Sequence, residues 1–277
     1  MSHLKELVQE RQALRAGDLQ SEAAVLIDDR TGQVLFKKNE QKQLYPASTT
    51  KLLTALIALE KGDPDALIIV GDEARIKSPG ESTADLYSGQ KLTLRDLVAG
   101  LLLPSGNDAA RTIARYIARI DSGKRMPPEE GMAEFVNMMN TRAQQIGADN
   151  SHFVNPHGLP DEQHYTTAAD LAQIALAARQ NKLLREIVSL REYTIDTGAA
   201  DEKQIWINSN KLLHPDSGFY YKGTTGMKTG YTSAAGYCLV ASAERNGQEL
   251  IAVVLNSTAN DVWQDAIKLF DYGFTRR

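Results

Sequence analysis

Short apolar runs near both ends of the chain enclose a long middle segment in which apolar residues recur at helical spacing. Near the N-terminus, residues 23–27 and 33–36 are strand-like runs joined by the polar segment 28–32, which predicts a β-hairpin. Between residues 93 and 190, apolar residues return every three to four positions, as expected for packed helices. This spacing is found in Leu94, Leu97, Val98 and Leu101, in Ala109, Ile113 and Ile117, in Phe135, Val136, Met139 and Ile146, and in Leu171, Ile174 and Ala175.

After residue 191 the pattern returns to short apolar runs. Residues 204–207, 237–242 and 250–255 favour strands, and residues 262–270 favour a final helix. Strands at both ends of the chain around a helical middle predict one sheet built from distant segments, with a helical lobe inserted between them.

The same pattern suggests how the chain is divided. We predict a helical lead-in over residues 1–19, in which residues 4–15 form a short charged helix, and a main domain over residues 20–277. A helical lobe at about residues 93–190 interrupts the sheet of this domain. With 277 residues, of which 42% are hydrophobic, the chain is long enough for a substantial core.

Charge and composition exclude several function classes. The net charge of −4 and the absence of a basic run provide no electrostatic footprint for nucleic acid. No stretch approaches the roughly 20 apolar residues that span a membrane, and residues 1–6 lack the pattern of a secretory signal. The chain is therefore expected to be cytoplasmic or to have lost a leader. Cys238 is the only cysteine, which excludes an internal disulfide, and its apolar neighbours predict a buried, inert thiol.

Three short polar motifs follow one another along the chain: Ser48-Thr49-Thr50-Lys51, Ser105-Gly106-Asn107 and Lys228-Thr229-Gly230. Together they provide a serine nucleophile, a lysine base, a second hydroxyl and a cationic clamp, which is the set used by penicillin-recognising acyl-transfer enzymes. A serine three residues before a lysine is not specific alone, because Ser2/Lys5 and Ser88/Lys91 also fit. The combination and order of the motifs carry the prediction.

The surroundings of each motif allow a structural and a functional interpretation. The nearly continuous apolar run at residues 52–59 places Ser48 at the first turn of a buried helix, with Lys51 on the same face. The alternative is an ordinary N-cap serine. Ser105 follows a Leu-rich run ending in proline and is expected in a tight turn, where it and Asn107 would otherwise only cap a helix beginning near Asp108.

With these motifs, the chain resembles the D-alanyl-D-alanine carboxypeptidases among the low-molecular-mass penicillin-binding serine peptidases. The resemblance extends over residues 92–97, 105–110, 153–159, 226–230 and 235–237, and covers roughly residues 20 to 275. It implies an α+β fold in which an antiparallel sheet is covered by helices, with an all-helical lobe and the site in the cleft between them. It also implies no cofactor and no metal, and a place outside the cytoplasmic membrane after removal of a leader.

The resemblance further implies a role for each motif residue. Ser48 would attack the carbonyl between two terminal D-alanines of a peptidoglycan stem peptide, Lys51 would accept its proton, and Ser105 would relay a proton to the leaving amine. Lys51 must be neutral for this, so burial and a second cation, Lys228, are expected to lower its pKa. The remaining residues form the substrate-binding set: Asn107 for the substrate amide or for Lys51, Lys228, Thr229 and Gly230 for the terminal carboxylate, and Tyr231, whose backbone N–H would bind the oxyanion with that of Ser48. β-Lactam antibiotics would acylate Ser48.

One departure from the family pattern leaves the substrate open. Relatives often carry an arginine after the strand at residues 250–255 that supplements the carboxylate clamp, whereas Asn256-Ser257-Thr258 stand here. A weaker preference for a terminal carboxylate would favour D,D-endopeptidase cleavage of cross-linked peptides. A penicillin-sensing domain that acylates without turnover would keep the same motifs.

Two other enzyme classes fit less well. A class A β-lactamase needs a glutamate in a Glu-x-x-Leu-Asn sequence, but residues 134–137 have the wrong spacing and Gly106 replaces its usual aspartate. A zinc peptidase is suggested by three histidines near Asp161, but their spacing matches known ligand patterns poorly. These histidines are His152, His157 and His164.

Overall fold

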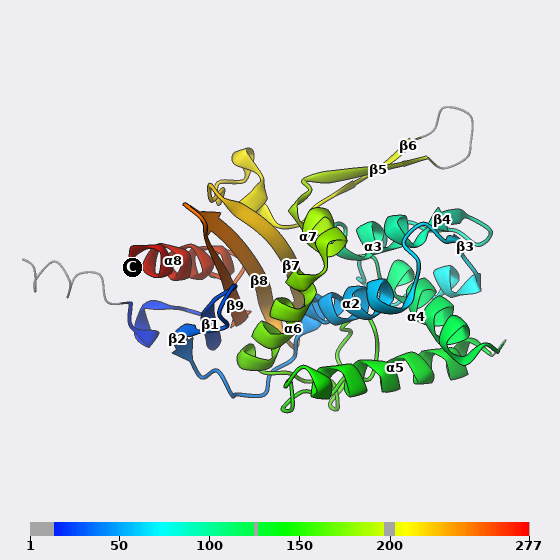
Figure 1. Cartoon of the computed structure of the whole chain (residues 1–277), viewed down its shortest axis with the longest axis horizontal. Helices are drawn as coiled ribbons and strands as arrows, with labels where there is room; N and C mark the ends of the chain where they lie inside the picture. Colours follow the sequence, from blue (N-terminus) through cyan, green and yellow to red (C-terminus); the bar gives the residue numbers. More distant parts are fainter. Residues whose placement is uncertain (1–13, 125–126, 197–202, 277) are drawn as a thin grey trace, which may run out of the picture.

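A five-stranded antiparallel sheet joins the two ends of the chain (Figure 1). The computed structural model describes residues 14–124, 127–196 and 203–276. The strand order is β2-β1-β9-β8-β7, so the N-terminal hairpin pairs with the C-terminal strands. The strands are β1 (Ala23–Asp28), β2 (Val34–Lys38), β7 (Thr224–Thr232), β8 (Gly236–Arg245) and β9 (Gln248–Ser257). The α+β fold with its antiparallel sheet is therefore confirmed.

The sheet is buried on both faces, because successive side chains of a strand point to opposite sides. In β1, Val25 and Ile27 join the core under the helical layer, whereas Ala24 and Leu26 join a second core under α8 (Asp261–Thr275). The same alternation continues in β9. This explains why the central strands appear in the sequence as continuous apolar runs.

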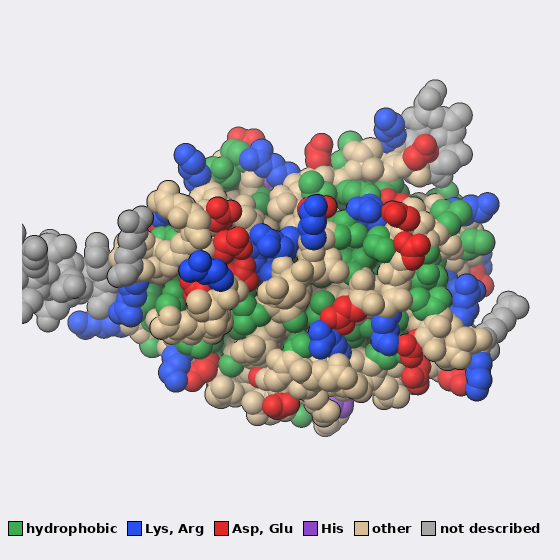
Figure 2. All heavy atoms as spheres, viewed as in Figure 1, with side chains coloured by type: hydrophobic (Ala, Val, Ile, Leu, Met, Phe, Trp, Pro, Cys, Tyr) green, Lys and Arg blue, Asp and Glu red, His purple; other side chains and the backbone are tan. Residues whose placement is uncertain are grey.

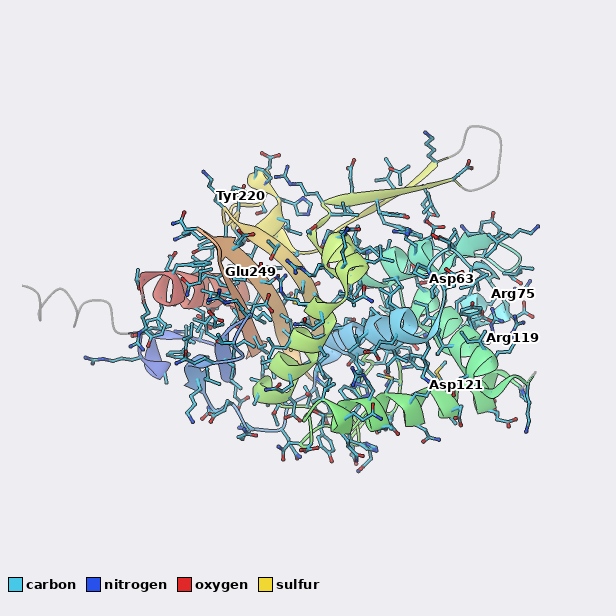
Figure 3. The ribbon with its side chains drawn as sticks, viewed as in Figure 1. Asp63, Arg75, Arg119, Asp121, Tyr220 and Glu249 are labelled. Carbon is cyan, nitrogen blue, oxygen red and sulfur yellow. The ribbon has the colours of Figure 1, made fainter. Side chains whose placement is uncertain are left out.

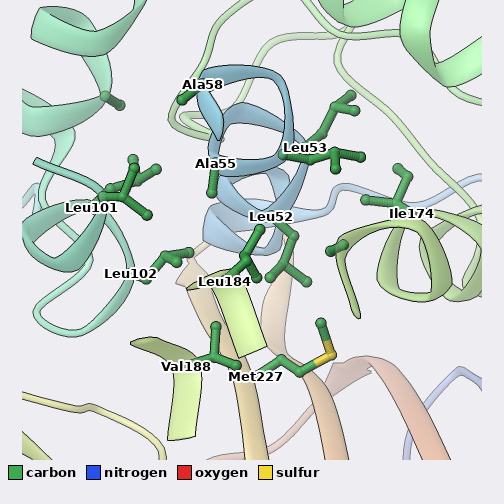
Figure 4. Packing of buried hydrophobic residues seen from close by; sticks show 14 of the residues in the cluster. Leu52, Leu53, Ala55, Ala58, Leu101, Leu102, Ile174, Leu184, Val188 and Met227 are labelled. Carbon is green, nitrogen blue, oxygen red and sulfur yellow. The ribbon is translucent and has the colours of Figure 1, made fainter. Parts of the chain in front are cut away.

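The face of the sheet opposite α8 supports the remaining α-helices of the described residues. They are α2 (Lys51–Lys61), α3 (Leu94–Leu102), α4 (Asn107–Ser122), α5 (Pro128–Gln145), α6 (Ala168–Gln180) and α7 (Lys182–Ser189). The last two pack on the sheet, and α2 lies in the middle of the layer (Figure 1). Figure 4 shows Leu52 and Leu53 of α2 among side chains of α3, α6, α7 and β7. Helix α2 is apolar on nearly every side because it has no solvent face at its centre.

Two small hairpins extend the helical side. One pairs β3 (Leu67–Ile69) with β4 (Lys91–Thr93), and the other pairs β5 (Glu192–Asp196) with β6 (Lys203–Ile207). The strand expected at residues 204–207 therefore exists, but it belongs to a separate hairpin and not to the main sheet. None of the helices in the described ranges is long and apolar enough to cross a membrane.

The predicted lead-in helix at residues 4–15 lies almost entirely outside the described residues. Within the described part of residues 1–19, Ala16–Asp18 forms a short 3-10 helix, and Leu19 packs into the core under α8.

Candidate active site

Ser48 lies in a 3-10 turn, Ala47–Thr50, that runs directly into α2. The sequence predicted the first turn of the α-helix itself. The turn is tighter because the Thr49 and Thr50 hydroxyls donate back to the carbonyls of Pro46 and Ala47, at 2.7 and 2.8 Å. Lys51 still follows one turn later on the same face, so the predicted Ser48–Lys51 neighbourhood is present.

The Lys51 amine has three partners and no solvent exposure. Its Nζ lies 2.8 Å from Ser48 Oγ, 2.6 Å from Asn107 Oδ1 and 2.8 Å from the His157 carbonyl oxygen. The two carbonyl oxygens only accept hydrogen bonds. A neutral amine has two N–H groups and one lone pair, so it satisfies both carbonyls and directs its lone pair at the Ser48 hydroxyl.

The electrostatic surroundings favour that neutral form. Burial, and then the positive charge of Lys228, hold the pKa of the Lys51 ammonium well below its usual range. Within the described ranges, no carboxylate lies within hydrogen-bond distance of the Lys51 amine. A buried lysine without an anionic partner can act as a general base near neutral pH.

Of the second motif, Asn107 is hydrogen-bonded to Lys51 in the structure. Ser105 is buried in a tight turn with φ of +69°, in the left-handed region that a non-glycine residue rarely adopts. No hydrogen bond joins its side chain to Lys51 in the part of the chain that the structure describes. Asn107 begins α4, with Gly106 at the N-cap position.

The third motif lies on β7, the strand that packs against the turn carrying Ser48. Lys228 is 1% exposed, and its Nζ donates to the carbonyl oxygen of Thr229 at 2.9 Å. Burial lowers the pKa of Lys228 to about 7. The Thr229 hydroxyl lies 2.6 Å from the Ser209 hydroxyl.

Gly230 allows β7 to approach the nucleophile. A Cβ at this position would come within 2.9 Å of the Ser48 backbone nitrogen, so a larger residue would fill the space beside that N–H group. Tyr231 follows, is 55% exposed, and packs its ring on Tyr237 with centroids 4.4 Å apart. Ser48, Asn107 and the segments 79–82, 157–160 and 231–234 line a cavity of about 450 Å³, a size typical of small-ligand sites.

A second glycine holds the serine turn from the opposite side. Gly158 has a φ of +90°, and a Cβ there would lie 1.9 Å from the Ala47 carbonyl oxygen. The preceding residue, His157, provides the carbonyl oxygen that accepts from Lys51. Sequence reasoning included residues 153–159 in the family resemblance and considered the His157 side chain only as a zinc ligand, because a backbone acceptor leaves no trace in residue type.

Sequence reasoning also missed Glu81 and Ser209. Glu81 accepts a hydrogen bond from Asn107 Nδ2 at 2.9 Å, and its side chain is 2% exposed. Both residues lie in loops without a distinctive motif, and only the fold brings Glu81 to Asn107 and Ser209 to Thr229.

Each of the three histidines considered as zinc ligands has at least one ring nitrogen engaged with a protein group. His164 Nδ1 accepts from the Val154 N–H, and its Nε2 lies 2.9 Å from the Thr50 hydroxyl. His157 Nδ1 accepts from a backbone N–H, and His152 Nδ1 lies 2.6 Å from a backbone carbonyl oxygen. Across residues 14–124, 127–196 and 203–276, no three His, Cys, Asp or Glu side chains are grouped to hold a metal ion.

Comparisons with known proteins agree with this geometry. The model of the peptidase S11 family, described as D-alanyl-D-alanine carboxypeptidase, matches residues 8–259. The chain is 34% identical over 260 residues to the D-alanyl-D-alanine carboxypeptidase of Streptomyces sp. strain K15. This match covers 90% of this chain and 85% of the relative. The crystal structure of the Streptomyces K15 DD-transpeptidase superposes with a TM-score of 0.84 at 32% identity, covering 93% of this chain and 98% of that one.

Some relatives are longer than this chain. It is 34% identical over 276 residues to the D-alanyl-D-alanine carboxypeptidase DacF of Bacillus subtilis, a match that covers 95% of this chain and 64% of the relative. The match to the D-alanyl-D-alanine carboxypeptidase DacD of Escherichia coli has 33% identity and covers 62% of that relative. Together, the family match, the identity and the shared fold show that the chain belongs to the peptidase S11 family of serine D-alanyl-D-alanine carboxypeptidases.

Proposed function

We propose that the chain is a serine-type D-Ala-D-Ala carboxypeptidase. It removes the terminal D-alanine from peptidoglycan stem pentapeptides through an acyl-enzyme on Ser48, and it is inhibited by β-lactams. The observation that carries this proposal is the buried Lys51 amine, 2.8 Å from Ser48 Oγ with acceptor-only partners on its other sides. This is the arrangement that a lysine needs in order to take a proton from a serine.

The acylation step begins at that contact. Ser48 Oγ attacks the carbonyl carbon between the two D-alanines as its proton moves to Lys51 Nζ. The oxyanion of the tetrahedral intermediate accepts from the backbone N–H groups of Ser48 and Tyr231, an interaction typically worth about 3 to 4 kcal/mol. The C–N bond then breaks, and the leaving amine takes a proton from Lys51 through the Ser105 hydroxyl.

Deacylation reverses the roles with water as the attacking group. Water adds to the acyl carbon and transfers a proton to Lys51, which returns it to Ser48 Oγ as the ester bond breaks. The name DD-transpeptidase in the related Streptomyces structure indicates an amine as the acceptor in that protein. For this chain we propose water, and an added amine acceptor such as glycine tests the choice directly.

Recognition of the terminal carboxylate is assigned to β7. The carboxylate would lie between Lys228 and the hydroxyls of Thr229 and Ser209, which are already 2.6 Å apart. A bound carboxylate would stabilise the charged form of Lys228, whose pKa in the free protein is lowered to about 7. Substrate binding and protonation of Lys228 are therefore coupled.

The experiment is release of D-alanine from a stem pentapeptide ending in D-Ala-D-Ala, with Ser48→Ala as the control. Multiple turnovers by the wild type and none by the variant are expected. Intact-mass spectrometry after penicillin should show one adduct on the wild type only. A stoichiometric burst of D-alanine without turnover would favour a penicillin-sensing domain, and an adduct retained by Ser48→Ala would remove that serine from its role.

A D,D-endopeptidase is the second candidate, and one observation favours it. None of the described residues lining the cavity is an arginine, and Asn256-Ser257-Thr258 stand at the end of β9, after the apolar run 250–255, where relatives often carry one. Asn256 donates instead to Glu22 at 2.6 Å. A higher kcat/KM for a cross-linked peptide dimer than for the pentapeptide would identify the endopeptidase as the main activity.

The proposed substrate also sets the place of action. Peptidoglycan stem peptides are found outside the cytoplasmic membrane, so we propose that the protein works in the cell envelope or is secreted. Fractionation of cells that express the full-length product, followed by labelling with a fluorescent penicillin, tests this assignment. Label confined to the cytoplasmic fraction would contradict it.

A further inference from the structure

A buried ion pair lies directly behind the Asn107 amide, away from the reacting atoms. Glu81 and Arg111 are paired at 2.5 Å and 3.1 Å through both oxygens of the carboxylate, with side-chain exposures of 2% and 4%. Arg111 also donates to the Ile76 carbonyl oxygen at 2.7 Å. Glu81 also accepts from Asn107 Nδ2, so the pair reaches the residue that binds Lys51.

An asparagine amide has two chemically different ends, and the partner on each side decides which way it points. A carboxylate only accepts hydrogen bonds, so Glu81 must face the NH₂ group of Asn107. The carbonyl oxygen is then left facing Lys51, where it is found at 2.6 Å. In the opposite orientation, the amide N–H would donate to the amine and occupy the lone pair that Ser48 needs.

From this geometry we propose that Glu81 is a positioning residue for the reaction: its carboxylate fixes the Asn107 amide and so keeps the Lys51 lone pair directed at Ser48. Arg111 holds the carboxylate in place and neutralises it. Glu81 itself does not touch the reacting atoms. The inference rests on the acylation step of the proposed function and does not depend on deacylation or on the release of D-alanine.

The same carboxylate also acts on Lys51 through its charge. The charged groups facing Lys51 are Lys228 from β7, Asp108 and Arg111 from α4, and Glu81 from the loop before β4. The His157 imidazole also faces Lys51, and burial and the charge of Lys51 hold its pKa well below its usual range. Lys228 and Arg111 lower the pKa of Lys51, whereas Glu81 and Asp108 raise it. Arg111 and the Asn107 amide hold the pKa of Glu81 below its usual range despite burial, so Glu81 is charged at neutral pH. Removing it should therefore shift the lysine titration to lower pH.

The chain offers a matched control one helical turn away. Glu73 pairs with Arg115 of α4 at 2.8 Å, with side-chain exposures of 5% and 23%. Glu73 also accepts from the Gly71 N–H and has no contact with Asn107. Glu73→Gln therefore removes a comparable ion pair on the same helix without releasing the amide.

The experiment measures the second-order rate of acylation by a chromogenic β-lactam between pH 5 and pH 10 for the wild type, Glu81→Gln, Glu81→Asp and Glu73→Gln. Glu81→Gln should reduce the plateau acylation rate by about 10². The acid limb of its pH–rate profile, where the rate falls as Lys51 becomes protonated, should move to lower pH. Glu81→Asp keeps an acceptor-only group, so its rate should lie between those of the wild type and Glu81→Gln. Glu73→Gln should lower the melting temperature and leave both the rate per folded molecule and the limb unchanged.

Two results would overturn the proposal. One is a wild-type rate in folded Glu81→Gln, and the other is a uniform loss of rate with the acid limb unmoved, which would make the role of Glu81 purely structural. If Glu81→Gln fails to fold because Arg111 is left unpaired, the double variant Glu81→Gln/Arg111→Gln replaces it, and a wild-type rate there also contradicts the proposal. A wild type that is acylated but releases no D-alanine defeats the carboxypeptidase assignment alone, and this test still decides on Glu81.

Discussion

Among the buried basic side chains, Lys51 and Arg179 have partners that are opposite in kind. Lys51 contacts a hydroxyl and two neutral carbonyl oxygens. Arg179 of α6 is 4% exposed and forms ion pairs with Asp29 and Glu249, with further contacts to the Thr225 and Ser242 hydroxyls. Figure 3 marks Glu249 over the sheet, and Figure 2 shows acidic and basic side chains gathered on that part of the surface.

The difference teaches what each buried cation is for. Burying a charge is unfavourable unless it is paired and hydrogen-bonded, so Arg179 with its two carboxylates is a structural group. Lys51 has no carboxylate partner, and it relieves the same penalty by giving up its proton. An unpaired buried amine beside a nucleophile therefore indicates chemistry, and a paired one indicates packing.

The largest expected effect comes from making Lys51 permanently charged. Lys51→Arg places a permanent cation at the site and removes the base, because a guanidinium does not deprotonate in proteins. Acylation by penicillin should fall by about 10² to 10⁴. The measurement is an intact-mass time course at pH 7 and pH 9, and a near-normal rate at either pH would show that another group takes the Ser48 proton.

The opposite result is expected from breaking the structural cluster. Arg179→Met leaves the Asp29 carboxylate buried without its cation, whereas the more exposed Glu249 keeps Arg185 at 3.5 Å. The substitution should lower the free energy of unfolding by about 3 to 5 kcal/mol. The rate of acylation per folded molecule should not change, because the cluster contacts neither Ser48 nor Lys51. Urea unfolding and penicillin acylation on the same preparation test both statements. Normal stability combined with slow acylation would contradict the division between the two sites.

A smaller effect should follow from changing the backbone contact that supports Ser48. Gly158→Ala would place a Cβ 1.9 Å from the Ala47 carbonyl oxygen, so the serine turn must move. Both stability and acylation should fall, acylation by about 10² if the shift approaches 1 Å. Gly147→Ala is the control, since Gly147 also has a positive φ of +77° but nothing lies within 4 Å of its added Cβ. The control should lose about 1 kcal/mol of stability and no activity, and equal effects in the two variants would argue against a specific role for Gly158.

The smallest effect concerns pH and Lys228. Its folded-state pKa is lowered to about 7, whereas an unfolded lysine titrates near ~10.4, so the unfolded chain binds more protons between these values. The free energy of unfolding should therefore rise with pH from 7 to 10, and Lys228 contributes about 1 kcal/mol per pH unit. Lys228→Met should reduce the slope by that amount in urea unfolding at pH 7, 8 and 9. An unchanged slope would mean that Lys228 is already paired or hydrated in the folded protein.

Much of the fold followed from local pattern. The hairpin at residues 23–36, the helical middle and the final helix were predicted because period-two and period-3.6 apolar spacing is a local property of the chain. The hairpin that contains residues 204–207 was not placed, because a short strand carries no information about its partner. The lead-in at residues 1–19 and the domain limits remain predictions.

The site was predicted unevenly, for a physical reason. Ser48, Lys51 and Lys228 belong to motifs whose residue types are themselves the chemistry, and the structure gathers them around one buried amine. Ser105 was predicted as a proton relay by the same reasoning and stays a prediction. The His157 carbonyl and Glu81 were beyond reach, since one is a backbone atom and the other lies on a loop whose position depends on α4.

What the sequence alone determined is the order in which the chain presents the groups that we propose react. The tertiary structure decided their state. Only when β7 packs against the serine turn, and α4 brings Asn107 with Glu81 behind it, does Lys51 lose both water and every carboxylate contact. Its pKa depends on distances between segments far apart in the chain, and such distances are set by packing rather than by local pattern.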